Sequence, residues 1–422
     1  MKLKKIAALI AIAGLSTSAF ATNGYFAHGY GIKAKGMGGV GIAYGQDALA
    51  AATNPANMVL VGNRWDVGVE YFRPQRESTI VGNGAGANGK YDGNDSENYF
   101  VPEFGYNKMI SSNMSLGVSV YGNGGMATDY GRNPFAAFGA TGKAGVDLAQ
   151  LFIAPTWSYK LNENHSVGVS LKIAYQTFEA FGLSDPTLAA GFAGISSNAN
   201  KLTNNDHDSS WGWGLGFGWT GQVTPTLKLG AVYQSKTSMQ KFDEYKGLFA
   251  EKGGFDIPEN YGLGLAWQAT PKLLIAADIQ RINYSEIKSI ANPLRFPPAA
   301  GQLLGNNGGS GFGWDDMTVF KIGFAYDINQ AWTVRAGYNH GSQPIPSSQT
   351  FFNILAPGVV EDHLTLGATW RLQSGSEVTF MYMHAFEKDV KGSNSIPVGF
   401  GGGNANLKMY QDSLGIAYGA KF

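Results

Sequence analysis

The sequence lacks cysteine, a net charge and, after its N-terminal segment, any long apolar run. Without cysteine the chain can form neither disulfide bonds nor thiolate metal sites. Lysine plus arginine and aspartate plus glutamate number 31 each, so the overall charge gives no reason to expect a nucleic-acid partner. No later run reaches the length of about 18 apolar residues that a membrane-spanning helix requires, which excludes such a helix from the mature protein.

Aromatic residues and glycine are abundant, with 25 Phe, 20 Tyr, 9 Trp and 59 Gly in 422 residues. They alternate in residues 211–219, which read Trp-Gly-Trp-Gly-Leu-Gly-Phe-Gly-Trp. Because successive side chains of a strand point to opposite faces, one face of this segment is large and apolar and the other is nearly bare. The pattern is typical of a lipid-facing wall around an open interior, and it predicts an outer-membrane β-barrel.

Residues 1–21 have the three parts of a secretory signal peptide. Lysines near the N-terminus precede an apolar run over residues 6–15, and Ala19-Phe20-Ala21 offers a small-residue cleavage site. About ten apolar residues are too few to span a bilayer as a helix, which needs roughly 20. We therefore expect a signal peptide at residues 1–21 and a mature chain that begins at Thr22.

Apolar and polar residues alternate in about fourteen segments from Arg64 to the C-terminus. Rows such as Trp65, Val67, Val69 and Tyr71 contain no charge, whereas charged side chains occupy the alternate positions of several segments. A Lys or Arg on the lipid face near the middle of a bilayer costs about 2–4 kcal/mol, so the charged positions are expected to face the lumen. These inward positions are Asp66, Glu70, Lys172, Asp278, Lys321, Arg335 and Arg371.

Short and long connections alternate between these segments. The long ones are rich in Gly, Asn and Ser, and the short ones are expected at residues 111–113, 162–164, 224–226, 269–272, 329–330 and 373–375. An even number of strands with short turns on the periplasmic side is typical of bacterial outer-membrane barrels. The sequence therefore predicts an all-β fold, a 14-stranded antiparallel transmembrane β-barrel over residues 64–422.

The segment before the first strand, residues 22–63, does not alternate and is rich in glycine and alanine. It is short for a domain, so we expect an N-terminal hatch that plugs the barrel lumen. Residues 36–41, Gly-Met-Gly-Gly-Val-Gly, satisfy the dinucleotide pattern GxGxxG. They lack a preceding apolar strand and an acidic residue about 20 positions later, so we interpret these glycines as close-packing positions and expect no cofactor.

Several segments resemble the FadL/TodX family of outer-membrane transporters, which carry long-chain fatty acids and other hydrophobic compounds. They are residues 29–39, 48–52, Asn54-Pro55-Ala56-Asn57-Met58, residues 121–130, Ile257-Pro258-Glu259 and the C-terminal strand that ends in Phe422. The resemblance implies a hatch that contains Asn54, Pro55 and Ala56. It also implies that substrate leaves sideways through a gap in the wall at a kinked third strand.

The kink is matched by Gly122, Asn123, Gly124 and Gly125. Glycines inside an alternating strand weaken its pairing and bend it, which agrees with a gap. An ordinary β-bulge near a loop is the alternative interpretation.

Three inward cations, Lys172, Lys321 and Arg335, are candidates for contact with a substrate carboxylate, because a charge-assisted hydrogen bond would form there. The alternative is that they pair with lumen acids such as Glu70 or Asp278. Asp206-His207-Asp208 could attract a divalent ion that bridges lipopolysaccharide, although loop charges are usually solvated. No histidine spacing suits zinc and no GxSxG element occurs, so we expect no metal site and no enzyme.

The sequence thus predicts passive uptake of a hydrophobic compound, most simply a long-chain fatty acid, across the outer membrane of a Gram-negative bacterium. Aromatic hydrocarbons are the alternative substrates. A general porin is a further alternative, and it would show a large stable conductance that a hatch should prevent. The expected partners are outer-membrane lipid, lipopolysaccharide and, through Phe422, the barrel-assembly machinery, and we expect a monomer.

Overall fold

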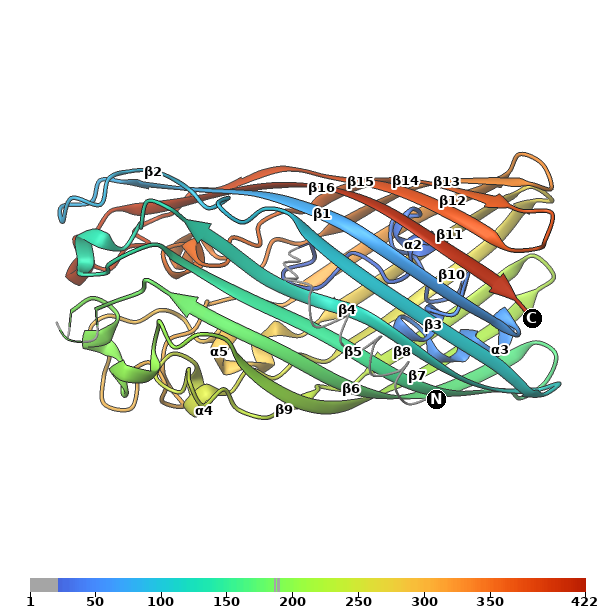
Figure 1. Ribbon diagram of the computed structural model, residues 1–422, viewed down its shortest axis with the longest axis horizontal. Coiled ribbons are helices and arrows are strands. Elements are labelled where there is room, and N and C mark those ends of the chain that lie inside the picture. Colours follow the sequence, from blue (N-terminus) through green and yellow to red (C-terminus); the bar gives the residue numbers. More distant parts are fainter. Residues whose placement is uncertain (1–21, 186, 188–189) are drawn as a thin grey trace.

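The computed structural model describes residues 22–185, 187 and 190–422, so the expected signal peptide lies outside the described residues. The chain forms a closed antiparallel barrel of 14 strands, in which each strand pairs with the next and the last pairs with the first (Figure 1). This confirms the predicted fold class. The strands are β1 (Arg64–Val81), β3 (Tyr99–Ser111), β4 (Met114–Tyr130), β5 (Ala144–Lys160), β6 (His165–Phe181), β7 (Asp208–Thr224), β8 (Leu227–Gln234), β10 (Asn260–Thr270), β11 (Leu273–Ile282), β12 (Met317–Asp327), β13 (Trp332–Gly341), β14 (Asp362–Arg371), β15 (Glu377–Val390) and β16 (Asn404–Lys421).

Two short strands lie outside this ring, and sequence reasoning did not anticipate them. Strand β2 (Gly89–Asp92) pairs with β1, and β9 (Ser238–Met239) pairs with β7. The helices are short: α2 (Ile32–Lys35), α3 (Met58–Val61), α4 (Ala250–Gly253) and α5 (Lys288–Ala291). Within the described residues, none is long and apolar enough to cross a membrane.

Long loops gather at one end of the barrel and short turns at the other (Figure 1). The long-loop end, on the left of the figure, carries α4 and α5, and the C-terminus lies at the short-turn end. The short turns fall between β3 and β4, β5 and β6, β7 and β8, β10 and β11, β12 and β13, and β14 and β15. These positions agree with the turns that the sequence predicted.

The wall has the two faces that its alternation predicted. Outward side chains such as Leu263 (62% exposed), Phe320 (52%) and Leu414 (56%) form an apolar belt. The inward charged residues Asp66, Glu70, Lys172, Asp278, Lys321 and Arg335 are buried. The fold therefore places a row of charged groups inside the barrel, around its N-terminal segment.

That segment, residues 22–63, fills the lumen toward the short-turn end and is drawn in blue in Figure 1. Its backbone comes so close to the wall that a Cβ atom on several wall glycines would collide with it. These glycines include Gly105, Gly168, Gly218, Gly230 and Gly337. The expectation that the glycines of residues 211–219 line an open interior is therefore wrong, because other atoms occupy the space beside them: the hatch at Gly218, the β6 side chain of Lys172 at Gly216, and residues 235–239 at Gly212 and Gly214.

Candidate functional site

The Asn54-Pro55-Ala56 triplet fastens the hatch to strand β7. Pro55 begins a short 3₁₀ turn that Asn54 caps, because the Asn54 side-chain oxygen accepts a hydrogen bond from the Ala56 amide at 2.9 Å. The Asn54 amide group donates to the Ile42 carbonyl at 2.6 Å. It also donates to the Trp219 carbonyl at 3.1 Å and to the Thr220 hydroxyl at 3.0 Å. One buried side chain thus joins the turn, a second part of the hatch and the wall.

The three candidate cations also point at the hatch. Lys172 donates to the Ala51 carbonyl at 3.1 Å and to the Tyr121 hydroxyl at 3.0 Å. Lys321 lies 3.5 Å from the Gly39 carbonyl. Arg335 donates to the Gln46 side chain at 2.9 Å and to the Thr369 hydroxyl at 2.7 Å.

Among the described residues, Lys172, Lys321 and Arg335 have no carboxylate oxygen within 4.0 Å, so the expected pairing with lumen acids is absent at that distance. Asp278 sits directly across from Lys321 in the β11–β12 register, yet its carboxylate accepts the Gly41 and Ile42 amides at 2.8 and 3.1 Å. The hatch backbone thus contacts Lys172, Lys321 and Asp278, and a hatch side chain contacts Arg335, whereas sequence reasoning assigned these charges to substrate or to one another.

The hatch adds charges of its own that sequence reasoning missed. Lys35 pairs with Glu70 at 2.5 Å, and Lys33 pairs with Glu377. Glu103 accepts the Gly31 and Ile32 amides at 3.2 and 2.8 Å. These ion pairs could have been predicted from the two lysines of the hatch, because the wall around the hatch carries inward acidic residues.

Strand β4 loses its neighbour on one side. Its pairing with β3 ends at Val120, opposite Phe104, although β4 runs on to Tyr130 and β3 begins at Tyr99. On its other side β4 stays paired with β5, with a register shift between Gly122 and Gly124. We call residues 121–128 of β4 the free edge. The predicted kink residues, Gly122 to Gly125, therefore lie at a bulge within this free edge.

Hatch backbone pairs with the bulge through an antiparallel bridge between Phe26 and Gly124. The Ala27 amide donates to the Asn123 carbonyl at 2.9 Å, and the Gly125 amide donates to the Tyr25 carbonyl at 3.0 Å. The Tyr30 hydroxyl donates to the Asn123 side chain at 2.8 Å. A Cβ atom on Gly124 would collide with the Tyr25 carbonyl, so glycine is required there by close approach. Hatch and free edge are thus in direct contact.

The long loops enclose an apolar groove of about 650 Å³. Aromatic rings meet edge to face across it, with centroids 5.4 Å apart for Phe138 and Phe400 and 5.0 Å apart for Phe296 and Phe400. None of the described residues that line this loop groove is charged, and its volume falls in the range of roughly 300–1,000 Å³ that small-molecule sites have. Its lining comes from five loops, which contribute residues 85, 137–139, 190–191, 194–195, 296–298 and 399–400.

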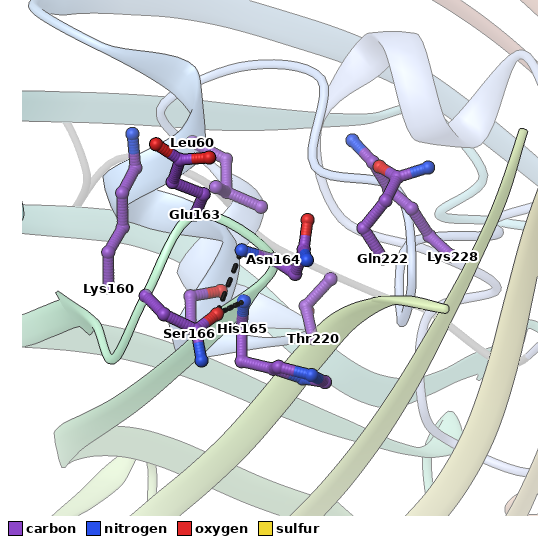
Figure 2. A pocket seen from close by; sticks show the side chains of 10 residues that line it. Leu60, Lys160, Glu163, Asn164, His165, Ser166, Thr220, Gln222 and Lys228 are labelled. Carbon is purple, nitrogen blue, oxygen red and sulfur yellow. Dashed lines mark hydrogen bonds between the residues drawn. The ribbon is translucent and has the colours of Figure 1, made fainter. Parts of the chain in front are cut away.

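A pocket at the short-turn end is much smaller, about 70 Å³ (Figure 2). It lies between Leu60 of the hatch helix α3 and the turn that joins β5 to β6, with Lys160 and Lys228 at its sides. The Asn162 side chain closes that turn by accepting the Asn164 and His165 amides, each at 2.9 Å. The pocket is too small for a fatty acid, so the loop groove is the better candidate for a hydrophobic ligand.

His207, in the loop before β7, contacts two carboxylates. Its Nε2 lies 3.2 Å from Asp147 and its Nδ1 lies 3.1 Å from Glu179. The hydrogen bond that His207 donates to the Asp147 carboxylate raises the pKa of His207 above its usual value near 6.5. The neighbouring Asp208 accepts the Glu244 amide at 3.0 Å. His207 and Asp208 are therefore engaged with protein groups, and among the described residues no group of three or more His, Asp and Glu side chains is arranged to hold a metal ion.

A family model described as outer membrane protein transport protein (OMPP1/FadL/TodX) matches residues 18–422. The Pseudomonas putida toluene transporter TodX has a similar fold, with a TM-score of 0.69 and 19% identity over 94% of this chain and 99% of that chain. The Ralstonia pickettii toluene transporter TbuX (TM-score 0.64, 20% identity) and a Pseudomonas aeruginosa FadL homologue (0.69, 17%) each cover the same shares. At these identities the likeness concerns the fold. No curated protein matches the sequence.

Proposed function

Because this chain belongs to the OMPP1/FadL/TodX family of outer-membrane transporters of hydrophobic compounds, we propose a path that a substrate follows through it. A hydrophobic molecule binds in the loop groove, passes between the hatch and the wall, and leaves sideways at the free edge of β4 into the membrane. The process is passive, needs no bound cofactor and includes no chemical step.

The observation that carries this proposal is the end of β3–β4 pairing at Val120 while β4 continues to Tyr130. Beyond Val120 the β3 side of β4 is met by the hatch, through the bridge between Phe26 and Gly124, and not by the neighbouring wall strand, so we place the opening at this edge. Lateral exit also avoids water. Moving apolar groups into water costs about 0.8 kcal/mol per methylene, or more than about 10 kcal/mol for a sixteen-carbon chain.

We propose a long-chain fatty acid as the substrate, whose carboxylate contacts a lumen cation. Lys172 supports this best, because it is buried, has no carboxylate within 4.0 Å among the described residues, and touches Tyr121 at the start of the free edge. Lys321 and Arg335 are the other candidates. An aromatic hydrocarbon is a second candidate substrate, favoured by the uncharged lining of the loop groove and by the rings of Phe138, Phe296 and Phe400.

We further propose that the barrel works as a monomer and that the barrel-assembly machinery recognises its C-terminal aromatic residue. Phe422 is 58% exposed, and its ring stacks on Tyr106 with centroids 5.6 Å apart. An exposed terminal aromatic side chain is available to a partner.

A reversible cross-link tests the exit. If the β3–β4 register continued beyond Phe104 and Val120, Pro102 would face Gly122. In this cysteine-free chain, a Pro102→Cys, Gly122→Cys variant can be oxidised to hold the two strands together. We expect oxidation to reduce fatty-acid uptake by cells and reduction to restore it. The control pair, Ile322→Cys with Tyr338→Cys, joins strands that are already paired and should leave uptake unchanged. Equal uptake by the oxidised and reduced forms of the first variant would reject lateral exit.

A further inference from the structure

A single arginine spans the wall where strand pairing is missing. Arg76 of β1 is 1% exposed and belongs to the largest fully buried side chains. On the β3 side of β1, pairing with β3 ends at Phe72, and pairing with β2 begins at Glu77. Arg76 therefore lies in the stretch of β1 that has no neighbouring strand on this side.

The guanidinium of Arg76 takes the place of that strand. It donates to the Ala127 carbonyl of the free edge at 2.5 Å and to the Ser96 carbonyl at 2.5 Å. Its Nε donates to the Asn94 side chain at 3.3 Å, and the ring of Tyr99 lies 5.9 Å away. The Ala127 carbonyl thus receives its donor from a side chain of β1 and not from an amide of β3.

The chain segment 93–95 completes this link. The Gly93 amide donates to the Arg76 carbonyl at 3.0 Å, and the Asp129 amide donates to the Gly93 carbonyl at 3.1 Å. The Asp95 amide donates to the Asp129 carbonyl at 3.1 Å. The free edge is therefore bounded at one end by the Phe104–Val120 pair. At the other end it is bounded by the contacts of Arg76 and residues 93–95 with Ala127 and Asp129, and we call this set of contacts the rim.

We infer that Arg76 is a positioning residue that holds the rim and so sets the width of the largest substrate that leaves at the free edge. This inference rests on the proposed lateral exit. A planar guanidinium has several donors in a fixed arrangement, so it can hold the Ala127 and Ser96 carbonyls together. Lysine is a single point donor on a flexible chain and cannot reproduce both contacts with the same geometry.

Size selectivity tests the inference. Arg76→Met keeps most of the side-chain volume and removes every donor, and Arg76→Lys keeps the charge. Arg73→Met is the matched control, because Arg73 lies on the same strand and pairs with Glu97 at 2.7 Å but is exposed and does not reach β4. The probes are a straight-chain fatty acid and a pyrene-labelled fatty acid of the same chain length.

We expect the ratio of pyrene-labelled to straight-chain uptake to rise several-fold in Arg76→Met, to rise less in Arg76→Lys and to stay unchanged in Arg73→Met. A general loss of folding would lower both rates and leave the ratio unchanged. Heat-modified mobility in detergent gels identifies folded barrels. An unchanged ratio in a folded Arg76→Met barrel would overturn the inference.

A distance measurement decides the same point without transport. Nitroxide labels at Phe100→Cys on β3 and Ala149→Cys on β5 stand on either side of the free edge. We expect their distance distribution to broaden in Arg76→Met and to stay narrow in Arg73→Met, and an unchanged distribution in Arg76→Met would refute the role of the arginine. The cross-link described above tests lateral exit independently. A failure of the proposed exit can therefore be distinguished from a failure of the role proposed for Arg76.

Discussion

Replacing Asn54 with alanine should loosen the hatch while the barrel stays folded. The substitution removes the cap on the Ala56 amide, which contributes about 1 kcal/mol, and the donors to Ile42, Trp219 and Thr220, each worth about 1 kcal/mol net. We therefore expect the free energy of local hatch opening to fall by about 2–4 kcal/mol. Since 1.4 kcal/mol is a factor of ten, the open fraction should rise roughly 30- to 900-fold.

Hydrogen exchange measured by mass spectrometry on the barrel in lipid nanodiscs reports this opening. Peptides from residues 36–62 should exchange faster in Asn54→Ala, whereas peptides from β10 to β13 should not change. Asn54→Asp is the informative comparison, because it keeps the capping oxygen but replaces the donating amide with an acceptor beside two carbonyls. We expect it to loosen the hatch at least as much as alanine does. Unchanged hatch exchange in Asn54→Ala, or full protection in Asn54→Asp, would refute this reasoning.

Four further predictions concern separate parts of the molecule. Replacing both Asn54 and Pro55 with Ala should reduce whole-cell uptake without preventing barrel assembly, as heat-modified gel mobility will show. Lys172→Met should weaken binding of a fatty acid more than binding of the matching alcohol in a fluorescence displacement assay, because only the carboxylate meets the charge; equal weakening would make Lys172 structural. Gly124→Val should force Tyr25 of the hatch away from β4 and speed exchange of residues 23–30, whereas unchanged exchange would contradict the close approach. His207 should titrate above pH 6.5 by NMR. Its protonated form beside Asp147 stabilises the folded protein below pH 6.5, and this stabilisation is lost as the pH rises through the pKa of His207 in the folded state. Asp147→Asn should therefore lower the pH midpoint of the His207 titration.

The barrel could be predicted from sequence because each strand of a membrane wall alternates apolar outward residues with inward ones along its whole length. The charge-free row from Trp65 to Tyr71 and the inward Lys172 and Lys321 were assigned to the correct faces for that reason. The same alternation gives no information about what an inward side chain touches. Its partners depend on where the hatch lies along the barrel axis.

The contacts of Asn54 and the cations could therefore not be derived from spacing. Glycines opposite large apolar residues suggested open space, although a close-packed hatch requires small wall residues just as an open lumen does. Arg76 was missed because its bond to Ala127 joins two strands that are not neighbours in the ring. Such a contact is possible only because β3–β4 pairing stops at Val120, and no local sequence pattern indicates where that pairing stops.

The most direct test of lateral exit is to find where a substrate touches the protein as it leaves. A fatty acid with a diazirine at its ω-end can be added to outer-membrane vesicles, cross-linked by light and mapped by mass spectrometry. The proposed path predicts adducts on residues 99–103 of β3 and on the free edge, residues 121–128 of β4. Adducts confined to the short-turn end, around Leu60 and the turn between β5 and β6, would contradict it and show that the substrate leaves into the periplasm.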